Sequence, residues 1–332
     1  MWFTIAPSLS TQSYARPHDP DIMNPHRRAL IELHICVVLW GFTAILGKLI
    51  TLPATQLVWW RMLLVTIALA CFPRVWRALR LIPPSQMLVF AGIGGVVALH
   101  WLAFYGSVKL ANASVAATTM ALAPAVTALI EPAITGARFE RHNLLLGILV
   151  IPGVALVVGG IPDSMHLGFW VGVISAALAA LFNALNKRYL GHHDAMAVTW
   201  LELGAGFLLL AVIAPFASPA GQAFVLPDVR DGALLLVLAI LCTLIPFALA
   251  LAALRHLSAF TTQLAVNLEP VYSIAIAVTF LGEARDLDGL FFLGVAIVLA
   301  AVFGHGWLQG RSYSGSVSAT EAPIAAGKKR GE

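Results

Sequence analysis

The stretch that decides the fold runs from Asn112 to Val126 and reads Asn-Ala-Ser-Val-Ala-Ala-Thr-Thr-Met-Ala-Leu-Ala-Pro-Ala-Val. It has a counterpart from Ser258 to Tyr272, which reads Ser-Ala-Phe-Thr-Thr-Gln-Leu-Ala-Val-Asn-Leu-Glu-Pro-Val-Tyr. In each stretch a proline follows a small polar residue by twelve positions. Self-similarity at a fixed spacing indicates that a chain is built from repeated structural units. The sequence therefore predicts two copies of one unit.

Other residues recur at nearly the same distance along the chain. The pairs at an offset of 146 are Pro124 with Pro270, Lys109 with Arg255, and Gly136 with Gly282. The pairs at an offset of 141 are Trp59 with Trp200 and Arg61 with Glu202. We place the two copies at residues 29–160 and 167–306.

Most of the chain is apolar in blocks that are long enough to cross a membrane. Hydrophobic residues make up 60% of the chain and charged residues only 11%, with a mean hydropathy of +0.88. A bilayer core about 30 Å thick needs a helix of about 20 apolar residues. The expected helices lie near 29–50, 54–72, 86–108, 111–135, 142–160, 167–186, 195–216, 232–252, 258–281 and 287–306. We therefore expect an all-α integral membrane protein with ten transmembrane helices.

Each copy contains five of these helices. Because five is odd, the second copy enters the membrane from the opposite face, which gives an inverted-topology repeat. Such repeats are typical of secondary transporters, in which the two halves exchange conformations around a site at the bilayer midplane. The repeat thus indicates a mechanism, transport by exchange of conformations between the two halves, as well as a fold.

The basic residues indicate how the chain is oriented, because cytoplasmic loops are enriched in Lys and Arg. With the N-terminus inside, the inner side collects Arg16, Arg27, Arg28, Arg74, Arg77, Arg80, Arg138, Arg141, Lys187, Arg188, Arg255, Arg311, Lys328, Lys329 and Arg330. The outer side receives only Lys48, Lys109, Arg230 and Arg285. We expect a multi-pass protein of the plasma (inner) membrane with both termini in the cytoplasm.

The two ends of the chain are polar. Residues 1–28 are expected to form a disordered cytoplasmic tail. Met23 begins the segment Met-Asn-Pro-His-Arg-Arg, so we expect residues 1–22 to be an extension upstream of the true translation start. Residues 310–332 are rich in Ser, Ala and Gly and end in Lys328-Lys329-Arg330. This composition predicts a second disordered cytoplasmic tail.

Several motifs resemble the EamA domains of the drug/metabolite transporter superfamily. They are Trp40-Gly41-Phe42-Thr43-Ala44-Ile45-Leu46-Gly47-Lys48, the Ala-Pro-Ala-Val and Leu-Glu-Pro-Val centres around Pro124 and Pro270, and Leu281-Gly282-Glu283. The resemblance implies ten helices around a central cavity and roles that include export of amino acids and other small metabolites. The first copy departs from the pattern, because Ala137-Arg138 follows Gly136 where the second copy has Glu283.

Glu269 is the deepest ionisable residue of the expected ninth helix. It lies eleven residues after Ser258, which at 1.5 Å per residue is about 16 Å into the membrane. An ionisable group at that depth costs about 2.5–3.5 kcal/mol on insertion scales, so its presence needs a reason. Pro270 would leave the carbonyl of Val266 without its helical partner. A carboxylate beside that carbonyl suits a substrate ammonium group or a proton, and the alternative is a role in helix packing.

Other polar and aromatic residues are candidates for the same cavity. Thr262, Tyr272 and Ser273 share the face of Glu269 on the ninth helix. His100, Trp101, Phe104 and Tyr105 form an aromatic face on the third helix, and Trp40 lies at the middle of the first. We name Glu269, Tyr272, Ser273, Thr262, His100, Trp101, Tyr105, Trp40 and Arg61 as candidate substrate-binding residues. For the aromatic residues, ordinary packing is an equally good explanation.

Arg61 and Glu202 each lie seven residues into their helix. A depth of about 10 Å lets their side chains reach the interface. We therefore expect Arg61 to extend outward and Glu202 inward, although Arg61 could still receive a substrate carboxylate.

These observations favour a secondary transporter of small organic metabolites such as amino acids, and export over import. The sequence has no GxxxxGK[ST] loop for ATP, no clustered metal ligands, and basic residues too scattered for a nucleic-acid partner. We expect no cofactor, a small-molecule and possible amino-acid-like substrate, the lipid bilayer as surroundings, and a homodimer as an open alternative. The rival function is a membrane-embedded enzyme acting on lipid-linked or small substrates, but no catalytic cluster supports it.

Overall fold

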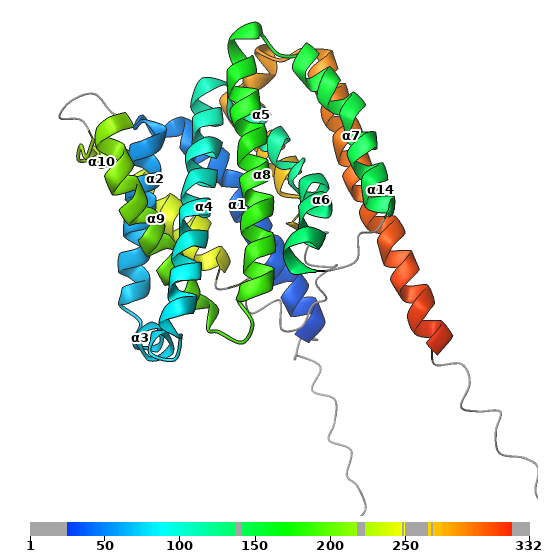
Figure 1. Ribbon diagram of the computed structural model, residues 1–332. Helices are drawn as coiled ribbons and strands as arrows, with labels where there is room; N and C mark the ends of the chain where they lie inside the picture. Colours follow the sequence, from blue (N-terminus) through cyan, green and yellow to red (C-terminus); the bar gives the residue numbers. More distant parts are fainter. Residues whose placement is uncertain are drawn as a thin grey trace, which may run out of the picture.

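The computed structural model describes residues 25–136, 141–217, 223–247, 249, 265, 266 and 268–320. Within these residues the regular elements are all helical. The longer helices are α1 (Pro25–Leu49), α2 (Ala54–Ala70), α3 (Pro73–Leu79), α4 (Pro84–Leu110), α5 (Ala113–Met120), α6 (Ala123–Thr135), α7 (Arg141–Gly159), α8 (His166–Tyr189), α9 (Ala195–Ala217), α10 (Val229–Ala239), α13 (Glu269–Ile276) and α14 (Gly289–Thr320), and most are labelled in Figure 1. The single turns are η1 (Asp163–Met165), η2 (Ile240–Leu244), η3 (Ala277–Leu281) and η4 (Glu283–Arg285).

Six helical segments are long and apolar enough to cross a bilayer. They are Arg27–Leu49, Pro84–Leu110, Ala113–Thr135, Asp163–Tyr189, Ala195–Phe216 and Val229–Phe247. Helices α2 and α3 add a seventh if they are counted as one span bent by 90°. The expectation of an all-helical membrane protein agrees with these helices. The count of ten stays a prediction, because Leu149–Gly159, Glu269–Leu281 and Gly289–Gly304 are shorter apolar segments among the described residues.

The bend between α2 and α3 has a local cause. Phe72 has an extended backbone (φ −93°, ψ 114°) and precedes Pro73, which opens α3. A residue before proline is driven away from helical angles by the proline ring. The long second span predicted at 54–72 therefore ends at Ala70, and the chain turns along the end of the bundle.

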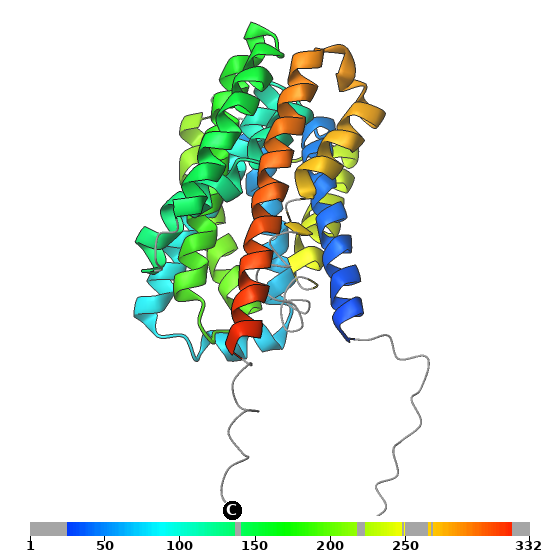
Figure 2. The same ribbon diagram turned by 90° about the vertical axis from the view of Figure 1, so that its right-hand side faces the viewer.

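Helix α1 begins and α14 ends at the same end of the bundle, as Figures 1 and 2 show. We call this the terminal end and the opposite one the far end. The loops between α1 and α2 and between α4 and α5, and the start of α10, lie at the far end (Figure 1).

The two predicted copies show matching breaks in their fourth helix. In the first copy, Leu122 (φ −81°, ψ −18°) precedes α6 and Pro124 lies in its first turn. In the second copy, Leu268 (φ −78°, ψ −15°) precedes α13 and Pro270 lies in its first turn. Proline fits the first turn of a helix because backbone nitrogens there form no hydrogen bond within the helix. The proline spacing predicted from the sequence thus marks two equivalent helix starts.

The same correspondence holds where these segments end. Gly136 closes α6 with φ 75°, and Gly282 follows η3 with φ 67°. Left-handed backbone angles of this kind favour glycine, which has no Cβ to clash. Starts and ends of the two segments are therefore both related by the offset of 146.

Helix packing repeats when the two halves are exchanged. Helix α1 packs on α13, and correspondingly α8 packs on α6. Helix α2 packs on α9, and α7 packs on α14, so that equivalent helices also pair directly. The fourth helices meet as well, because α5 contacts α13. This pattern is the one that an inverted repeat predicts.

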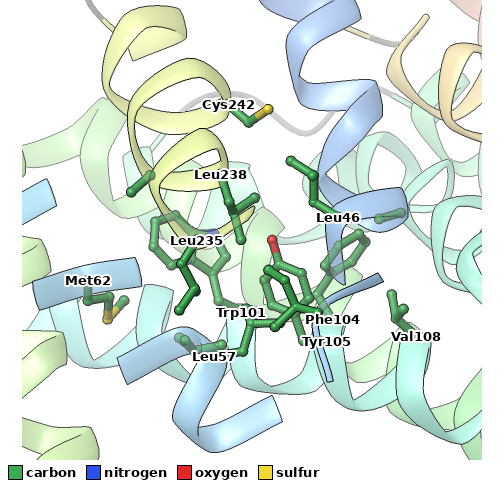
Figure 3. Packing of buried hydrophobic residues seen from close by; sticks show 14 of the residues in the cluster. Leu46, Leu57, Met62, Trp101, Phe104, Tyr105, Val108, Leu235, Leu238 and Cys242 are labelled. Carbon is green, nitrogen blue, oxygen red and sulfur yellow. The ribbon is translucent and has the colours of Figure 1, made fainter. Parts of the chain in front are cut away.

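The largest apolar cluster joins helices of both halves, with buried members from α1, α2, α4, α5, α9 and α10. Figure 3 shows Leu57, Met62, Trp101 and Tyr105 packed beneath Leu235 and Leu238, the latter two from α10. Apolar side chains in a protein interior are close-packed, so polar groups inside this cluster are held in fixed positions. The candidate site lies along its edge.

The paired glycines give a test of the repeat. Replacing Gly136 or Gly282 with Ala should lower the free energy of unfolding by about 1–2 kcal/mol, because alanine disfavours a positive φ. The comparison is Gly289→Ala, where an added Cβ meets no atom within 4 Å and φ is not positive. Thermal unfolding of the purified protein in detergent measures the stability of all three variants. Equal melting temperatures for Gly282→Ala and Gly289→Ala would contradict the assignment.

Candidate functional site

Arg61 of α2 is buried inside the bundle, with 4% of its surface exposed. Its Nε donates a hydrogen bond to Thr243 Oγ1 at 2.9 Å, and one terminal nitrogen donates to Tyr105 Oη at 2.8 Å. Its guanidinium carbon lies 3.8 Å from the ring centroid of Trp101. Arginine stacks on aromatic faces and donates in fixed directions, so these contacts define one orientation of the guanidinium group.

Thr243 reaches Arg61 because the helix widens at η2, a π-helical turn. Its hydroxyl donates to the carbonyl of Leu238 at 2.8 Å, which leaves its oxygen free to accept from Arg61. Turns of this type occur often at functional sites, because they change the direction of the side chains that follow. Figure 3 shows the hydroxyl group of Tyr105 directed toward the neighbouring segment that carries Leu238 and Cys242.

Arg61 retains donors beyond these two bonds. Guanidinium carries five N–H groups, and within the described part of the chain only the two above have hydrogen-bond partners. Glu269, at the first position of α13, interacts electrostatically with Arg61. The ion pairs of the described residues do not include Arg61 with Glu269, so the two groups are not joined by a direct salt bridge. The arrangement can bind a small solute that carries both charges.

Close packing of α1 fixes the position of α13. A Cβ on Gly41 would lie 3.0 Å from Cβ of Tyr272, and Ser273 Oγ donates to the carbonyl of Gly41 at 3.1 Å. The glycine of the Trp40-Gly41 motif is therefore needed for close approach. Ser273 is buried and its hydroxyl is used in this contact, whereas Tyr272 is half-buried.

The other predicted residues have contacts of their own. Trp40 packs edge-on against Phe247, with ring centroids 6.4 Å apart. His100 Nδ1 lies 2.9 Å from the carbonyl oxygen and from Oγ of Ser175, which ties α4 to α8. Thr262 lies outside the described residues. The structure thus brings Arg61, Trp101 and Tyr105 into contact and uses His100 in a helix contact, while Glu269 makes no hydrogen bond or ion pair with them among the described residues.

The expectation that Arg61 and Glu202 reach the two interfaces is wrong. Both side chains are 4% exposed, and Arg61 turns inward to its aromatic and hydroxyl partners. Depth along one helix does not reveal which way a side chain points, because packing between helices decides it. Thr243 was not predicted at all, since its contact with Arg61 depends on a π-helical turn that periodicity does not show.

Two buried carboxylates of the second half hold the far end. Asp231 accepts hydrogen bonds from the backbone nitrogen of Thr51 (2.9 Å) and from its hydroxyl (2.6 Å). Glu283 accepts from the backbone nitrogens of Ala113 (3.0 Å) and Ser114 (2.8 Å), at the start of α5. Carboxylates suit helix starts because the backbone N–H groups there lack helical partners. Glu283 therefore joins its own half to the first turn of the other.

Comparison with known proteins identifies the family. The model of the EamA-like transporter family matches residues 28–159 and again residues 166–306. The chain belongs to the EamA-like transporter family. The two matches coincide with the two copies predicted at 29–160 and 167–306.

Individual relatives agree with this assignment. The chain is 26% identical over 302 residues to a protein of Bacillus subtilis (strain 168) named uncharacterized transporter YxxF, covering 86% of this chain and 91% of that protein. It also resembles a protein of known crystal structure with a TM-score of 0.57 and 19% identity, over 86% of this chain and 98% of that one. The family and the relative's name point to a multi-pass membrane transporter rather than to an enzyme.

The role of Glu283 gives a stability test. Glu283→Ala should leave the backbone N–H groups of Ala113 and Ser114 buried without acceptors, at a cost of about 1–3 kcal/mol for each. Removing Glu131, whose pair with Lys187 lies at the surface, should cost no more than about 1 kcal/mol. Thermal unfolding in detergent compares the two variants. A Glu283→Ala protein as stable as Glu131→Ala would contradict the proposed contact.

Proposed function

We propose that this protein is a secondary transporter that moves small, amino-acid-like solutes outward across the plasma (inner) membrane by alternating access. Membership of the EamA-like transporter family and the exchange symmetry of the helix contacts support this proposal. In proteins built from inverted repeats, two conformations with opposite openings arise when the halves exchange their shapes.

The observation that carries the proposal is the buried guanidinium group of Arg61. It is oriented by Thr243 and Tyr105, stacked on Trp101, and has donors left over in the described part of the molecule. Planar, paired donors recognise a carboxylate well. A substrate carboxylate therefore binds Arg61, and the substrate ammonium group faces Glu269.

Aromatic side chains supply the rest of this site. Trp101 and Tyr105 flank Arg61, and Trp40 lies with Phe247 near the α1 contact with α13. Binding sites for small molecules combine mostly apolar walls with a few polar groups that set orientation. An organic side chain of the solute packs on these rings.

The breaks before α6 and α13 provide the moving parts. Discontinuous helices near the membrane midplane are a common feature of transporter binding sites. Glu269 lies at one of the two breaks, so movement of α13 changes its distance from Arg61. Since the sequence lacks an ATP-binding loop, an ion or solute gradient drives the cycle.

Exchange of labelled solutes by the purified protein in liposomes tests this function. A panel of amino acids and neutral sugars should give exchange of at least one amino acid and of no sugar. Arg61→Lys should then weaken binding at least about tenfold (~1.4 kcal/mol), because an ammonium group cannot reproduce the paired donors of guanidinium. Arg230→Lys, an exposed arginine near the start of α10, is the matched control. Unaltered exchange by Arg61→Lys would refute the carboxylate assignment.

Variants of Glu269 test the part of the same site that faces the substrate ammonium group. Glu269→Gln keeps the shape of the side chain and removes its charge, so folding should be retained while solutes with an ammonium group lose affinity. The same solute with its amine acetylated should be transported poorly by the original protein. A Gln variant that exchanges amino acids at the original rate would show that Glu269 only packs helices.

The orientation of the chain can be measured separately. The basic bias predicts that the C-terminus is cytoplasmic. A phosphatase fused after Trp307 should be inactive and a fluorescent protein fused there should be bright, because each folds on only one side of the bacterial membrane. The reverse pattern would place the terminal end outside.

A further inference from the structure

Glu202 is a second buried acid, separate from the site around Arg61. It lies on α9, near the terminal end, and is 4% exposed. Its Oε1 is buried and has no hydrogen-bond partner among the described residues. A buried carboxylate without a cation is unstable in an apolar environment, and ionisable residues inside membrane proteins generally have a function.

Glu202 is held in place by a close crossing of α9 with α4. A Cβ added to Gly94 of α4 would lie 2.1 Å from the carbonyl oxygen of Glu202. One turn further, a Cβ on Gly206 would lie 2.8 Å from the carbonyl oxygen of Gly94. The backbones therefore touch, and the glutamate cannot move away without separating the helices. The side-chain amide of Asn186 on α8 is the polar group beside the carboxyl group.

Among the described residues, the charged and titratable side chains around α9 either have other partners or lie at the surface. On α2, Arg61 bonds Tyr105 and Thr243, and on α4, His100 is paired with Ser175. The neighbouring elements also carry Arg74, which pairs with Asp194, the exposed Arg77 and Cys71, and Lys187, which pairs with Glu131. The ring of His193, just before α9, packs edge-on against Phe90 of α4, with centroids 5.8 Å apart. Within the part of the chain that is described, no ion pair neutralises Glu202.

The internal repeat relates the position of Glu202 to that of Arg61. Glu202 is the counterpart of Arg61 at an offset of 141, and the two lie toward opposite ends of the bundle. The electrostatic partners of Arg61 are Tyr105, Cys242 and Glu269, so Glu202 is not part of that cluster. One half thus places a cation in the substrate site, and the other half places an isolated acid at the equivalent point.

We propose that Glu202 is the proton-binding site that couples transport by this protein to the proton gradient. A proton from water binds a carboxylate oxygen and forms a neutral carboxyl group, which crosses to the other state of the cycle and releases the proton there. Solute moves the opposite way through the site around Arg61. The proposal rests on the transport function proposed above and identifies its driving ion.

A proton fits this site better than a metal cation. Metal ions need several oxygen ligands, and no group of three His, Cys, Asp or Glu side chains is present among the described residues. A proton needs only one oxygen lone pair. A single carboxyl group with one amide beside it is therefore sufficient.

Infrared spectroscopy of the protein in liposomes tests proton binding without any substrate. The carbonyl band of a protonated carboxyl group should change with pH in the original protein, and Glu202→Gln should remove one component of that change. Glu131→Gln, which replaces a surface acid near the same end, should not remove it. The proposal is overturned if the Glu202→Gln and original spectra change identically with pH.

Transport in the same liposomes tests coupling, with the amino acid that the exchange panel identifies. A gradient of one pH unit can concentrate a solute exchanged for one proton about tenfold. Glu202→Gln should exchange the labelled amino acid as before but show no accumulation, while Glu202→Asp should keep part of it. Accumulation by Glu202→Gln at the original level overturns the coupling role and leaves the transport function standing. Failure of the original protein to exchange any amino acid would instead refute the transport function itself.

Discussion

The fold depends on one constraint, that backbone hydrogen bonds within a membrane must be satisfied inside the protein. An interrupted helix is tolerated only where neighbouring helices cover the interruption. Both breaks, at Leu122 and Leu268, meet this condition, because α5 and α6 pack on α8 while α13 packs on α1. Prolines at the restart points remove donors that would otherwise lack partners.

Polar groups in the bundle follow a similar logic. Arg61 is stable in an apolar cluster because a hydroxyl, a phenol and an aromatic face each satisfy part of it. This arrangement fixes the direction of the guanidinium donors that have no partner among the described residues. Contacts from α2, α4 and η2 all meet at this residue. Movement of any one of these elements therefore changes the others through Arg61.

The sequence predicted the repeat well because it depends on local backbone chemistry. Proline and glycine spacing related the fourth helices of the two copies. It did not predict that α6 and α13 begin at these prolines, because unbroken helices were expected at 111–135 and 258–281. The sequence predicted the site less well. The inward direction of Arg61 depends on Tyr105 and Thr243, which are distant in the chain, and the role of Thr243 depends on a π-helical turn. Glu202 was expected at the interface, but the contact of its backbone with Gly94 keeps it inside. Patterns along one helix cannot reveal such contacts between helices.

Glu283 and Asp231 make the two ends of the molecule chemically unequal. In a perfectly symmetric repeat, the two transport conformations would have the same free energy. Here the first half has Ala137 where the second has Glu283. A conformation open at the far end would have to give up the hydrogen bonds from Ala113 and Ser114 to the Glu283 carboxylate. Hydrogen bonds to charged groups contribute about 1.5–3 kcal/mol each, so the two together contribute about 3–6 kcal/mol to the contact between the halves at this end. The alanine at the equivalent position of the first half cannot form such a contact, so this carboxylate lock belongs to one end of the molecule alone.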